Sequence, residues 1–297
     1  MISPLLANIA LHGLETTIVA AYSVGKKPTV VRYADDFVVM HEDVGVIGEI
    51  QERTNEWLSC LGLELKPSKT QIVHTLQAHE GRPGFDFLGF EVCQHRVGKN
   101  RSGKNAQGRL LGFKTIIRPS KEGQRRHLEA IEAVVKANRD APQDALVSRL
   151  NPVVSGWANY YSSVASKATF ARMDAGTYLK LLRWANRRHP KKNKAWVAHK
   201  YWRLETSGWT FGTKQGIKLY RHSRTPIRRH AKVRGTKSPY DGDWVYWATR
   251  TGKHPELPRR VATLLSWQKG RCARCGLYFK TEDLPEVDHI IPSENGG

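Results

Sequence analysis

Apolar and polar residues alternate along the chain at spacings that change from one segment to the next. In residues 1–20 the apolar positions have helical spacing, so we predict a helix there. Residues 29–40, TVVRYADDFVVM, carry β-branched and aromatic residues on both sides of two aspartates, which predicts two strands joined by a tight turn. A second helix is predicted from Ile47 to Leu61, ended by Gly62, and further strands are predicted at LELKP, TQIVHT and FDFLGFEVCQ.

From Ser120 to Arg188 the pattern is helical, with one face formed by Leu128, Ile131, Val134 and Val135. Asn151-Pro152 and Gly156 predict a break or kink inside this region. A loop rich in Gly and Lys is predicted at residues 96–108, and short, turn-rich structure is predicted after Pro239. We therefore expect an α+β multidomain chain, with domains at residues 1–118, 119–200, 201–255 and 256–297.

Charge changes this picture because it is concentrated in one stretch. The 297 residues have a formal net charge of +21, and residues 181–240 hold 17 Lys and Arg against one acidic residue, Glu205. Tryptophans and tyrosines alternate with these cations, so phosphates and unpaired bases of a nucleic acid are the expected ligands. The alternative is a solvated basic face over an aromatic core.

A membrane partner is not expected. The sequence has no run of about 18 apolar residues, and its first residues lack the basic flank and cleavage site of a signal peptide. We therefore expect the cytoplasm of a prokaryote, or an organelle, as the location.

Asp35 and Asp36 stand inside a run, Val30 to Met40, that otherwise predicts a buried strand. Two adjacent buried carboxylates cost desolvation and repulsion unless a cation lies beside them. Mg²⁺ prefers carboxylate and phosphate oxygens, and a pair of such ions supports in-line phosphoryl transfer. The alternative is an Asp-rich hairpin turn without a metal.

Cys272 and Cys275 form a Cys-x-x-Cys pair, whereas Cys60 and Cys93 stand alone. Such a pair indicates metal or redox chemistry and not a disulfide framework. Asp288 and His289 follow in the stretch VDHIIP. A histidine there is suited to act as a general base near neutral pH.

The motifs ISPLLANIALHGLE, RYADDFVVM, GLELKPSKTQIVHT and FDFLGFEV, in this order, closely resemble the palm of reverse transcriptases encoded by group II introns. RLNPVVSGWANYY, SKATFARMD and LLRWANRRHPKK resemble the maturase-specific, or thumb, region of the same family. The resemblance implies a partial right-hand polymerase palm, then a helical thumb, then a basic DNA-binding region. It also implies an RNA-directed DNA polymerase that binds its intron RNA, assists splicing and inserts the intron into target DNA.

The resemblance assigns polymerase roles to particular residues. Asp35 and Asp36 match the catalytic carboxylates that hold Mg²⁺, with Asp35 the stronger ligand candidate, and Tyr33 in the same turn would lie near the primer end. Lys69 matches a position that protonates or neutralises the leaving pyrophosphate, and its alternative is a solvated turn lysine. The hairpin that grips the primer is matched by Phe87, Leu88, Gly89 and Phe90, and the helix beside the deoxynucleotide site by Ser3, Pro4, Leu5 and Asn8.

In the basic stretch we expect cations to contact phosphates and tryptophans to stack on bases. The predicted nucleic-acid-binding residues are Arg183, Arg187, Arg188, Lys191, Lys192, Lys194, Lys200 and Trp184. Trp184 and Trp196 have a second interpretation as core anchors of the helical region.

The C-terminal stretch resembles the HNH endonuclease domain of many group II intron proteins. This resemblance implies that Asp288 is a ligand of the nuclease metal, again Mg²⁺, and that His289 is the general base. Cys272 and Cys275 would be half of a structural Zn²⁺ site. The family's remaining zinc ligands and its later Asn and His do not occur in this sequence, so we expect weak zinc binding and an inactive nuclease.

The family's palm also carries a metal-binding Asp and fingers upstream of the motif with which this sequence begins. We therefore expect this chain to be a fragment that does not polymerise DNA alone. Two further alternatives are a non-catalytic nucleic-acid-binding remnant of such a protein and, third, an HNH nuclease with basic DNA-binding domains.

Overall fold

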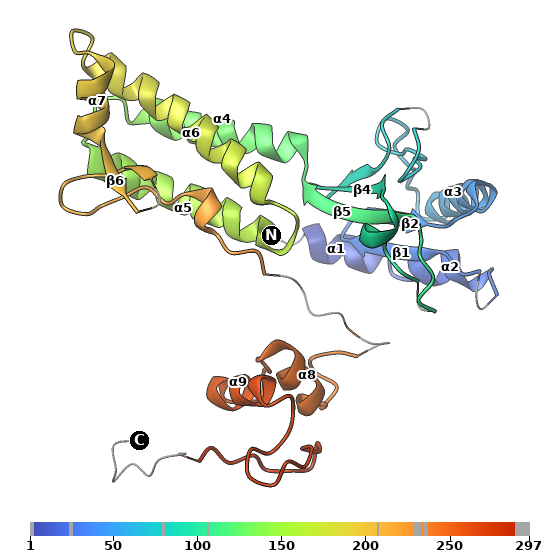
Figure 1. Ribbon diagram of the computed structural model, residues 1–297. Helices are drawn as coiled ribbons and strands as arrows, with labels where there is room; N and C mark the ends of the chain where they lie inside the picture. Colours follow the sequence, from blue (N-terminus) through green and yellow to red (C-terminus); the bar gives the residue numbers. More distant parts are fainter. Residues whose placement is uncertain are drawn as a thin grey trace. The chain divides into compact units, whose positions relative to one another are not determined.

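The computed structural model describes residues 3–23, 26–78, 81–105, 107–206, 208–228, 233 and 237–288. The chain divides into two units, Met1–Ile227 and Arg228–Gly297, which are described separately (Figure 1). Helices and small antiparallel sheets make up the first unit, so the predicted α+β class is confirmed.

The predicted N-terminal helix is two helices, α1 (Ser3–Ala10) and α2 (Leu14–Ala20). Gly13 separates them with a left-handed backbone (φ 94°), a conformation that glycine adopts without steric cost. Only α2 buries its apolar residues, Leu14 and Ile18, while Leu5 of α1 is exposed. The single-helix prediction was therefore wrong at Gly13.

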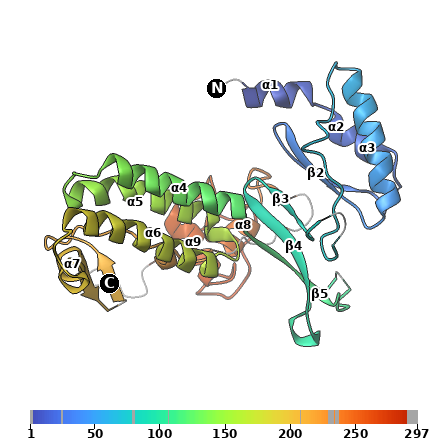
Figure 2. The same ribbon diagram turned by 90° about the horizontal axis from the view of Figure 1, so that it is seen from above.

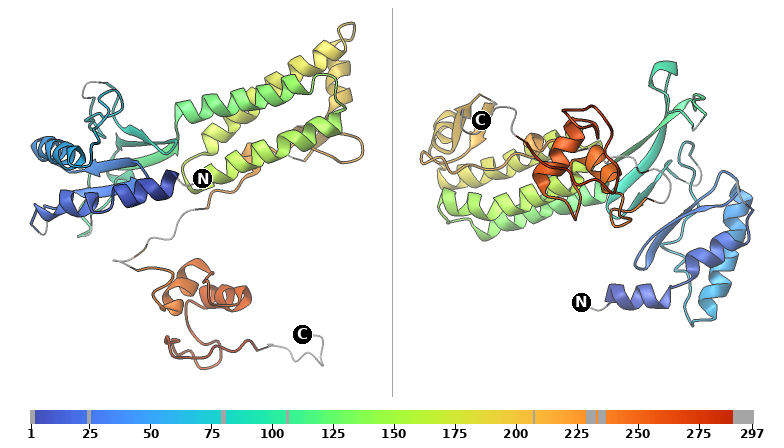
Figure 3. Two further views of the ribbon diagram at one scale, coloured as in Figure 1. Left: turned by 180° about the vertical axis from the view of Figure 1, so that it is seen from behind. Right: turned by 90° about the horizontal axis from the view of Figure 1, so that it is seen from below.

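A β-hairpin follows, built from β1 (Thr29–Tyr33) and β2 (Asp36–Met40) as the sequence predicted. One face of the hairpin, with Val30, Val39 and Phe37, packs on α2 and on α3 (Val44–Ser59). These elements are blue in Figure 3. Gly62 ends α3 as predicted, because its left-handed backbone (φ 70°) lets the Leu63 N–H bond to the Leu58 carbonyl.

The strands predicted at LELKP and TQIVHT are absent, since residues 63–75 form turns and irregular backbone. Pro67 lies in a turn closed by bonds from the Lys69 and Thr70 N–H groups to the Lys66 carbonyl. The FDFLGFEVCQ stretch is not one strand but two, β3 (Phe85–Phe87) and β4 (Phe90–Arg96). With β5 (Phe113–Pro119) they form an antiparallel sheet in the order β3-β4-β5. The predicted loop between β4 and β5 contains a short 3₁₀ helix, η1 (Lys99–Arg101).

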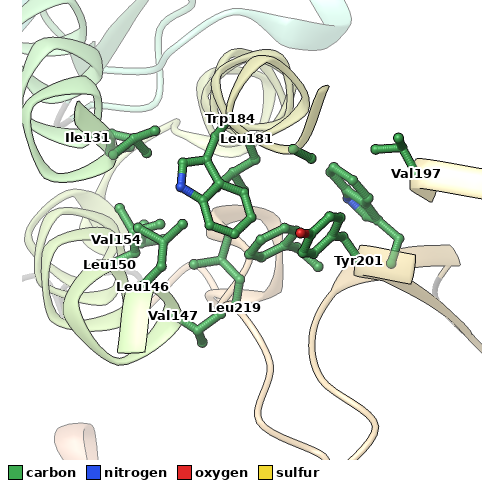
Figure 4. Packing of buried hydrophobic residues seen from close by; sticks show 14 residues of the cluster. Ile131, Leu146, Val147, Leu150, Val154, Leu181, Trp184, Val197, Tyr201 and Leu219 are labelled. Carbon is green, nitrogen blue, oxygen red and sulfur yellow. The ribbon is translucent and has the colours of Figure 1, made fainter. Parts of the chain in front are cut away.

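The predicted helical region is a bundle of α4 (Lys121–Ala137), α5 (Gln143–Tyr160) and α6 (Lys167–Arg188) (Figure 2). Beyond it come α7 (Lys194–Tyr201) and a hairpin of β6 (Trp202–Glu205) and β7 (Gly208–Phe211). Two 3₁₀ helices, η2 (Tyr161–Ser163) and η3 (His222–Arg224), complete this region. Its core contains residues of α4, α5, α6, α7, β6 and β7, and Trp184 lies at its centre (Figure 4).

The break predicted near Pro152 does not occur, since α5 runs from Gln143 to Tyr160 with Pro152 inside. Leu146, Leu150 and Val154 are all fully buried along one face of α5. We attribute the continuity of the helix to this packing, which outweighs the backbone hydrogen bond lost at proline.

The second unit contains α8 (Trp244–Thr251) and α9 (Arg259–Trp267), which pack against each other around Ala248, Ala262 and Leu265. They are orange and red in Figure 3. Sequence reasoning predicted only turn-rich structure after Pro239, so it missed these helices. No helix in the described ranges is both long and apolar enough to cross a membrane.

Candidate functional site

The turn between β1 and β2 presents the two aspartates. Tyr33 pairs with Asp36, so Ala34 and Asp35 form a two-residue turn, with Ala34 left-handed (φ 54°). Arg32 holds this turn in place. Its guanidinium donates to Glu15 Oε1 at 2.6 Å, to Asn8 Oδ1 at 3.0 Å and to the Ala34 carbonyl at 3.1 Å.

Arg32 therefore joins α1, α2 and the turn, and the hydrogen bond that it donates lowers the pKa of Glu15. Sequence reasoning missed both residues. The sequence did contain a signal for Arg32, because it is a cation at a strand position whose neighbours on the same face, Val30 and Phe37, are apolar.

Asp35 and Asp36 are both exposed, and the strands beside them are only partly buried. The prediction of a buried strand here was wrong, so the carboxylates carry little desolvation cost. Within the described ranges neither carboxylate has a recorded hydrogen bond or ion pair. Two open, adjacent carboxylates fit Mg²⁺, which takes one or two protein carboxylates and completes its shell with substrate phosphates and water.

The other predicted polymerase residues are placed as follows. Tyr33 is 66% exposed beside Asp36. Lys69 is exposed in the turn after α3, with no side-chain partner recorded in the described part of the chain. Ser3 and Pro4 begin α1, and their side chains lie outside the described part.

The turn at Leu88 and Gly89 joins β3 to β4, and both residues have left-handed backbones (φ 49° and 79°). Two tyrosines that follow each other at the end of α5 hold this turn. Tyr160 Oη donates to the Leu88 carbonyl at 2.9 Å, and Tyr161 Oη donates to the Gly89 carbonyl at 3.0 Å. Phe90 packs against both tyrosine rings, at centroid distances of 5.1 and 5.0 Å.

These contacts join the predicted primer-gripping hairpin, Phe87 to Phe90, to the helical bundle. Gly89 is required at this point, because a Cβ would lie 2.8 Å from Tyr161 Oη. Sequence reasoning gave the tyrosines no role, since the contact spans 72 residues.

A groove of about 170 Å³ runs between α4 and α6 and collects basic side chains. Five cations line it, two of them predicted and three missed by sequence reasoning: Arg183, Arg187, Lys136, Arg139 and Lys180. One carboxylate, Glu132, lies among them and binds Lys136 at 2.7 Å and Lys180 at 2.6 Å. Hydrogen bonds from Lys136 and Lys180 lower the pKa of Glu132 to about 2, so it stays ionised near neutral pH.

Trp184, which also lines the groove, is 4% exposed, and its indole N–H donates to the Asn138 carbonyl at 2.9 Å. This burial favours the core-anchor interpretation and argues against base stacking. Arg188 is likewise engaged. It donates to the carbonyls of Arg139 and Ala141, both at 2.9 Å, and its guanidinium carbon lies 4.7 Å from the Trp184 ring centre.

The remaining predicted cations lie on or next to α7. Lys191, Lys192, Lys194 and Lys200 are exposed there. Trp196 is 38% exposed, and the ammonium groups of Lys192 and Lys200 lie 5.4 and 4.9 Å from its ring centre. The second tryptophan is therefore accessible in a basic setting, unlike Trp184.

A buried polar chain that sequence reasoning missed crosses the bundle. Asp174 Oδ1 accepts from His222 Nδ1 at 2.8 Å, which leaves His222 Nε2 to accept from His127 Nε2 at 2.7 Å. His127 stacks on Trp157, with ring centres 4.4 Å apart. Burial, with a smaller effect of His222, lowers the pKa of His127 to about 3. Burial raises the pKa of Asp174, but hydrogen bonds from His222 and Ser223 lower it more, so the net shift is downward.

The segment from Lys218 to Thr225 is held along the bundle by three side chains. Asn151 bonds to the Lys218 carbonyl and the Tyr220 N–H, and Asp174 accepts from the N–H groups of His222 and Ser223. Lys167 donates to the carbonyls of Ser223 and Thr225. All six bonds involve main-chain atoms of the segment.

In the second unit, Cys272 and Cys275 lie in a tight turn. The Gly276 N–H bonds to the Cys272 carbonyl at 2.9 Å, and the Cys272 N–H bonds to the Leu277 carbonyl at 2.8 Å. Hydrogen bonds from the backbone of Cys275 and Arg274 lower the pKa of the Cys272 thiol, which suits a thiolate ligand. Within the described ranges no three His, Cys, Asp or Glu residues gather around a common metal position. Asp288 is exposed, and His289 lies outside the described residues.

Comparison with known families covers most of the first unit. Residues 1–92 match the family described as reverse transcriptase (RNA-dependent DNA polymerase). Residues 124–202 match the family described as group II intron, maturase-specific domain. No curated protein matches the chain. The first match contains the Tyr33–Asp36 turn, and the second contains the basic groove and α7, so the chain combines a reverse transcriptase domain with a group II intron maturase-specific domain.

Proposed function

We propose that the chain belongs to an RNA-directed DNA polymerase and splicing maturase of a group II intron. The observation that carries the proposal is the join between the two matched domains. The Leu88–Gly89 turn in the first is hydrogen-bonded to Tyr160 and Tyr161 in the second. A polymerase hairpin and an RNA-binding bundle are thereby parts of one packed structure.

In the polymerase role, Asp35 and Asp36 hold Mg²⁺. The bound metal supplies charge stabilisation for the attacking and leaving oxygens of phosphoryl transfer. Arg32 fixes the turn that carries the carboxylates, and Tyr33, next to Asp36 and exposed, contacts the primer end. Lys69 neutralises the leaving pyrophosphate. The primer is positioned by Phe87, Leu88 and Gly89. Ser3 and Pro4 border the deoxynucleotide site.

In the maturase role, the basic residues of α6 and α7 bind intron RNA through its phosphates. The C-terminal unit acts on target DNA when the intron is inserted. There Cys272 and Cys275 supply two zinc thiolates, and Asp288 and His289 belong to an HNH nuclease centre. The lowered pKa of the Cys272 thiol supports the zinc proposal.

Asp35→Asn tests the polymerase role. We expect primer extension on an RNA template with Mg²⁺ to fall by at least about 100-fold, because a group that stabilises transition-state charge is lost. Binding of Mn²⁺, followed by electron paramagnetic resonance as a substitute for Mg²⁺, is expected to weaken in parallel.

Glu42→Gln is the matched control, because Glu42 is an exposed carboxylate at the far end of the same hairpin. Equal activity and equal Mn²⁺ binding in the Asp35→Asn variant and this control would contradict the polymerase role. If the unaltered chain binds RNA but extends no primer by itself, as the sequence leads us to expect, the comparison of Mn²⁺ binding alone decides the role of Asp35.

A further inference from the structure

The groove between α4 and α6 contains more positive charge than its contacts within the protein use. Arg139, Arg183 and Arg187 are exposed. Within the described ranges, none of these three arginines forms an ion pair with a carboxylate. Lys180, Arg183 and Arg187 follow one another on α6 at intervals of three and four residues, so they lie along the groove on neighbouring turns, and Arg139 lies just after the end of α4.

Among the described residues that line it, the groove has no exposed aromatic ring on which an unpaired base could stack. Its one aromatic side chain, Trp184, is buried, and its indole N–H is already bonded to Asn138. Arginine and lysine can donate to base edges, but in double-stranded RNA these edges lie in a deep, narrow groove that side chains do not read, so cations on the protein surface meet the phosphates.

Glu132 is the exception within the groove, because it holds two of the five cations. Its two oxygens bind Lys136 of α4 and Lys180 of α6 separately. Side-chain exposure is 38% for Glu132 and 61% for Lys136 but 16% for Lys180, so a phosphate reaches this ionic bridge from solvent on the Lys136 side. Partly exposed ion pairs contribute little net free energy, which makes the bridge displaceable at a small cost.

We propose that the groove between α4 and α6 binds the phosphodiester backbone of RNA without reading its bases, and that Glu132 limits this binding by competing for Lys136 and Lys180. The inference rests on the proposed maturase function, since the five groove cations and Glu132 all lie within the match to the group II intron maturase-specific domain. A carboxylate in this position restrains non-specific binding by a strongly basic protein.

The test compares Glu132→Gln with Glu129→Gln in the full chain. Glu129 is an exposed carboxylate on α4 that pairs with Arg125 at 2.6 Å and does not line the groove, so both substitutions change the net charge equally. Affinity for a fluorescein-labelled RNA hairpin, and for the DNA hairpin of the same sequence, is measured by anisotropy across a range of salt concentrations.

We expect Glu132→Gln to bind RNA more tightly and to steepen the slope of log affinity against log salt by about one to two, one for each lysine released. Glu129→Gln should leave the slope unchanged. The double substitution of Arg183 and Arg187 by Gln should reduce the slope by a similar amount. If Glu132→Gln destabilises the fold and lowers the melting temperature, this double variant still tests whether the groove binds RNA.

Equal slopes for Glu132→Gln, Glu129→Gln and the unaltered chain would overturn the role of Glu132. An unchanged slope in the double arginine variant would overturn the groove. A steeper slope with DNA alone would overturn the assignment to RNA. Failure of the unaltered chain to bind RNA would instead contradict the proposed maturase function.

Discussion

Asp174, His222 and His127 come from α6, η3 and α4 and form one hydrogen-bonded chain inside the bundle. His222 is 1% exposed, and His127 is shielded by Trp157. A buried imidazole in such a place has no water to solvate a positive charge. Neutral His127 is therefore part of the folded state, and its protonation opposes folding.

We predict that acidification destabilises the bundle through His127. The unfolded chain takes up a proton near the ordinary pKa of 6.5, whereas folded His127 does so only at about 3, so unfolding is favoured as the pH falls between these values. At pH 5 the loss in free energy of unfolding relative to pH 7 is about 2 kcal/mol. Urea unfolding followed by circular dichroism at both pH values measures it.

In the His127→Gln variant, most of this difference in the free energy of unfolding between pH 7 and pH 5 should disappear. Carboxylates add little to the difference, because most of them stay ionised over this pH range in both the folded and the unfolded chain. His12→Gln replaces an exposed histidine and should retain it. The same pH dependence in both variants would rule out His127 as the cause.

At the scale of elements, two tyrosines, the last residue of α5 and the first of η2, hold a turn more than 70 residues earlier. Tyr161 Oη lies 2.8 Å from the position that a Cβ on Gly89 would take, and also 2.8 Å from the position of a Cβ on Gly123, which is too close for either Cβ to fit. One hydroxyl thus lies in the space left open by two glycines, between the turn from β3 to β4 and the start of α4.

We predict that Gly89→Ala is destabilising for two separable reasons, the left-handed backbone and the clash with the hydroxyl. The backbone conformation costs about 1 kcal/mol for alanine, and the clash adds to it. In a Tyr161→Phe background the second contribution should disappear, so the two substitutions are not additive. Thermal or urea unfolding of the four proteins in this cycle measures the coupling.

Gly108→Ala is the control for the first contribution, because Gly108 has a similar φ (81°) and nothing lies within 4 Å of the position that a Cβ would take. It should cost only the backbone contribution, and no dependence on Tyr161 is expected. Additive effects of Gly89→Ala and Tyr161→Phe would contradict the steric role of the hydroxyl.

Local patterns predicted the elements whose signals are local. The hairpin around Asp35 and the long helices of the bundle follow from the alternation and spacing of apolar residues. The break at Gly13 was missed because a glycine within an apolar helical pattern is ambiguous. The continuity of α5 at Pro152 was missed because it depends on packing from other helices.

The site shows the same division. The turn of Asp35 and Asp36 could be predicted from neighbouring residues, together with the resemblance of several motifs. Glu132 and Lys180, which are 48 residues apart, could not, because only the packing of α4 on α6 brings them together. Trp184 had two interpretations in the sequence, and burial distinguishes between them.

For the whole molecule, the relevant observation is that each unit has its own hydrophobic core. Leu150 belongs to the largest core cluster of the first unit, and Leu265 belongs to the cluster between α8 and α9. Both leucines are at most 2% exposed. A core that closes on itself supports cooperative unfolding of its own unit.

We predict two thermal transitions that respond to different substitutions. Leu265→Ala should lower the stability of the second unit by about 2–5 kcal/mol, because it removes buried methyl groups and leaves a cavity. Leu150→Ala should lower that of the first unit. Differential scanning calorimetry of the full chain measures both, and a shift of both transitions by either variant would contradict separate cores.

The segment from Lys218 to Thr225 is held by its peptide groups as well as by buried side chains such as Leu219 and His222. Asn151, Asp174 and Lys167 recognise N–H and carbonyl groups that nearly every residue type possesses. The path of this segment is thus encoded partly in the helices beneath it, through main-chain contacts that a change of side chain on the segment leaves in place.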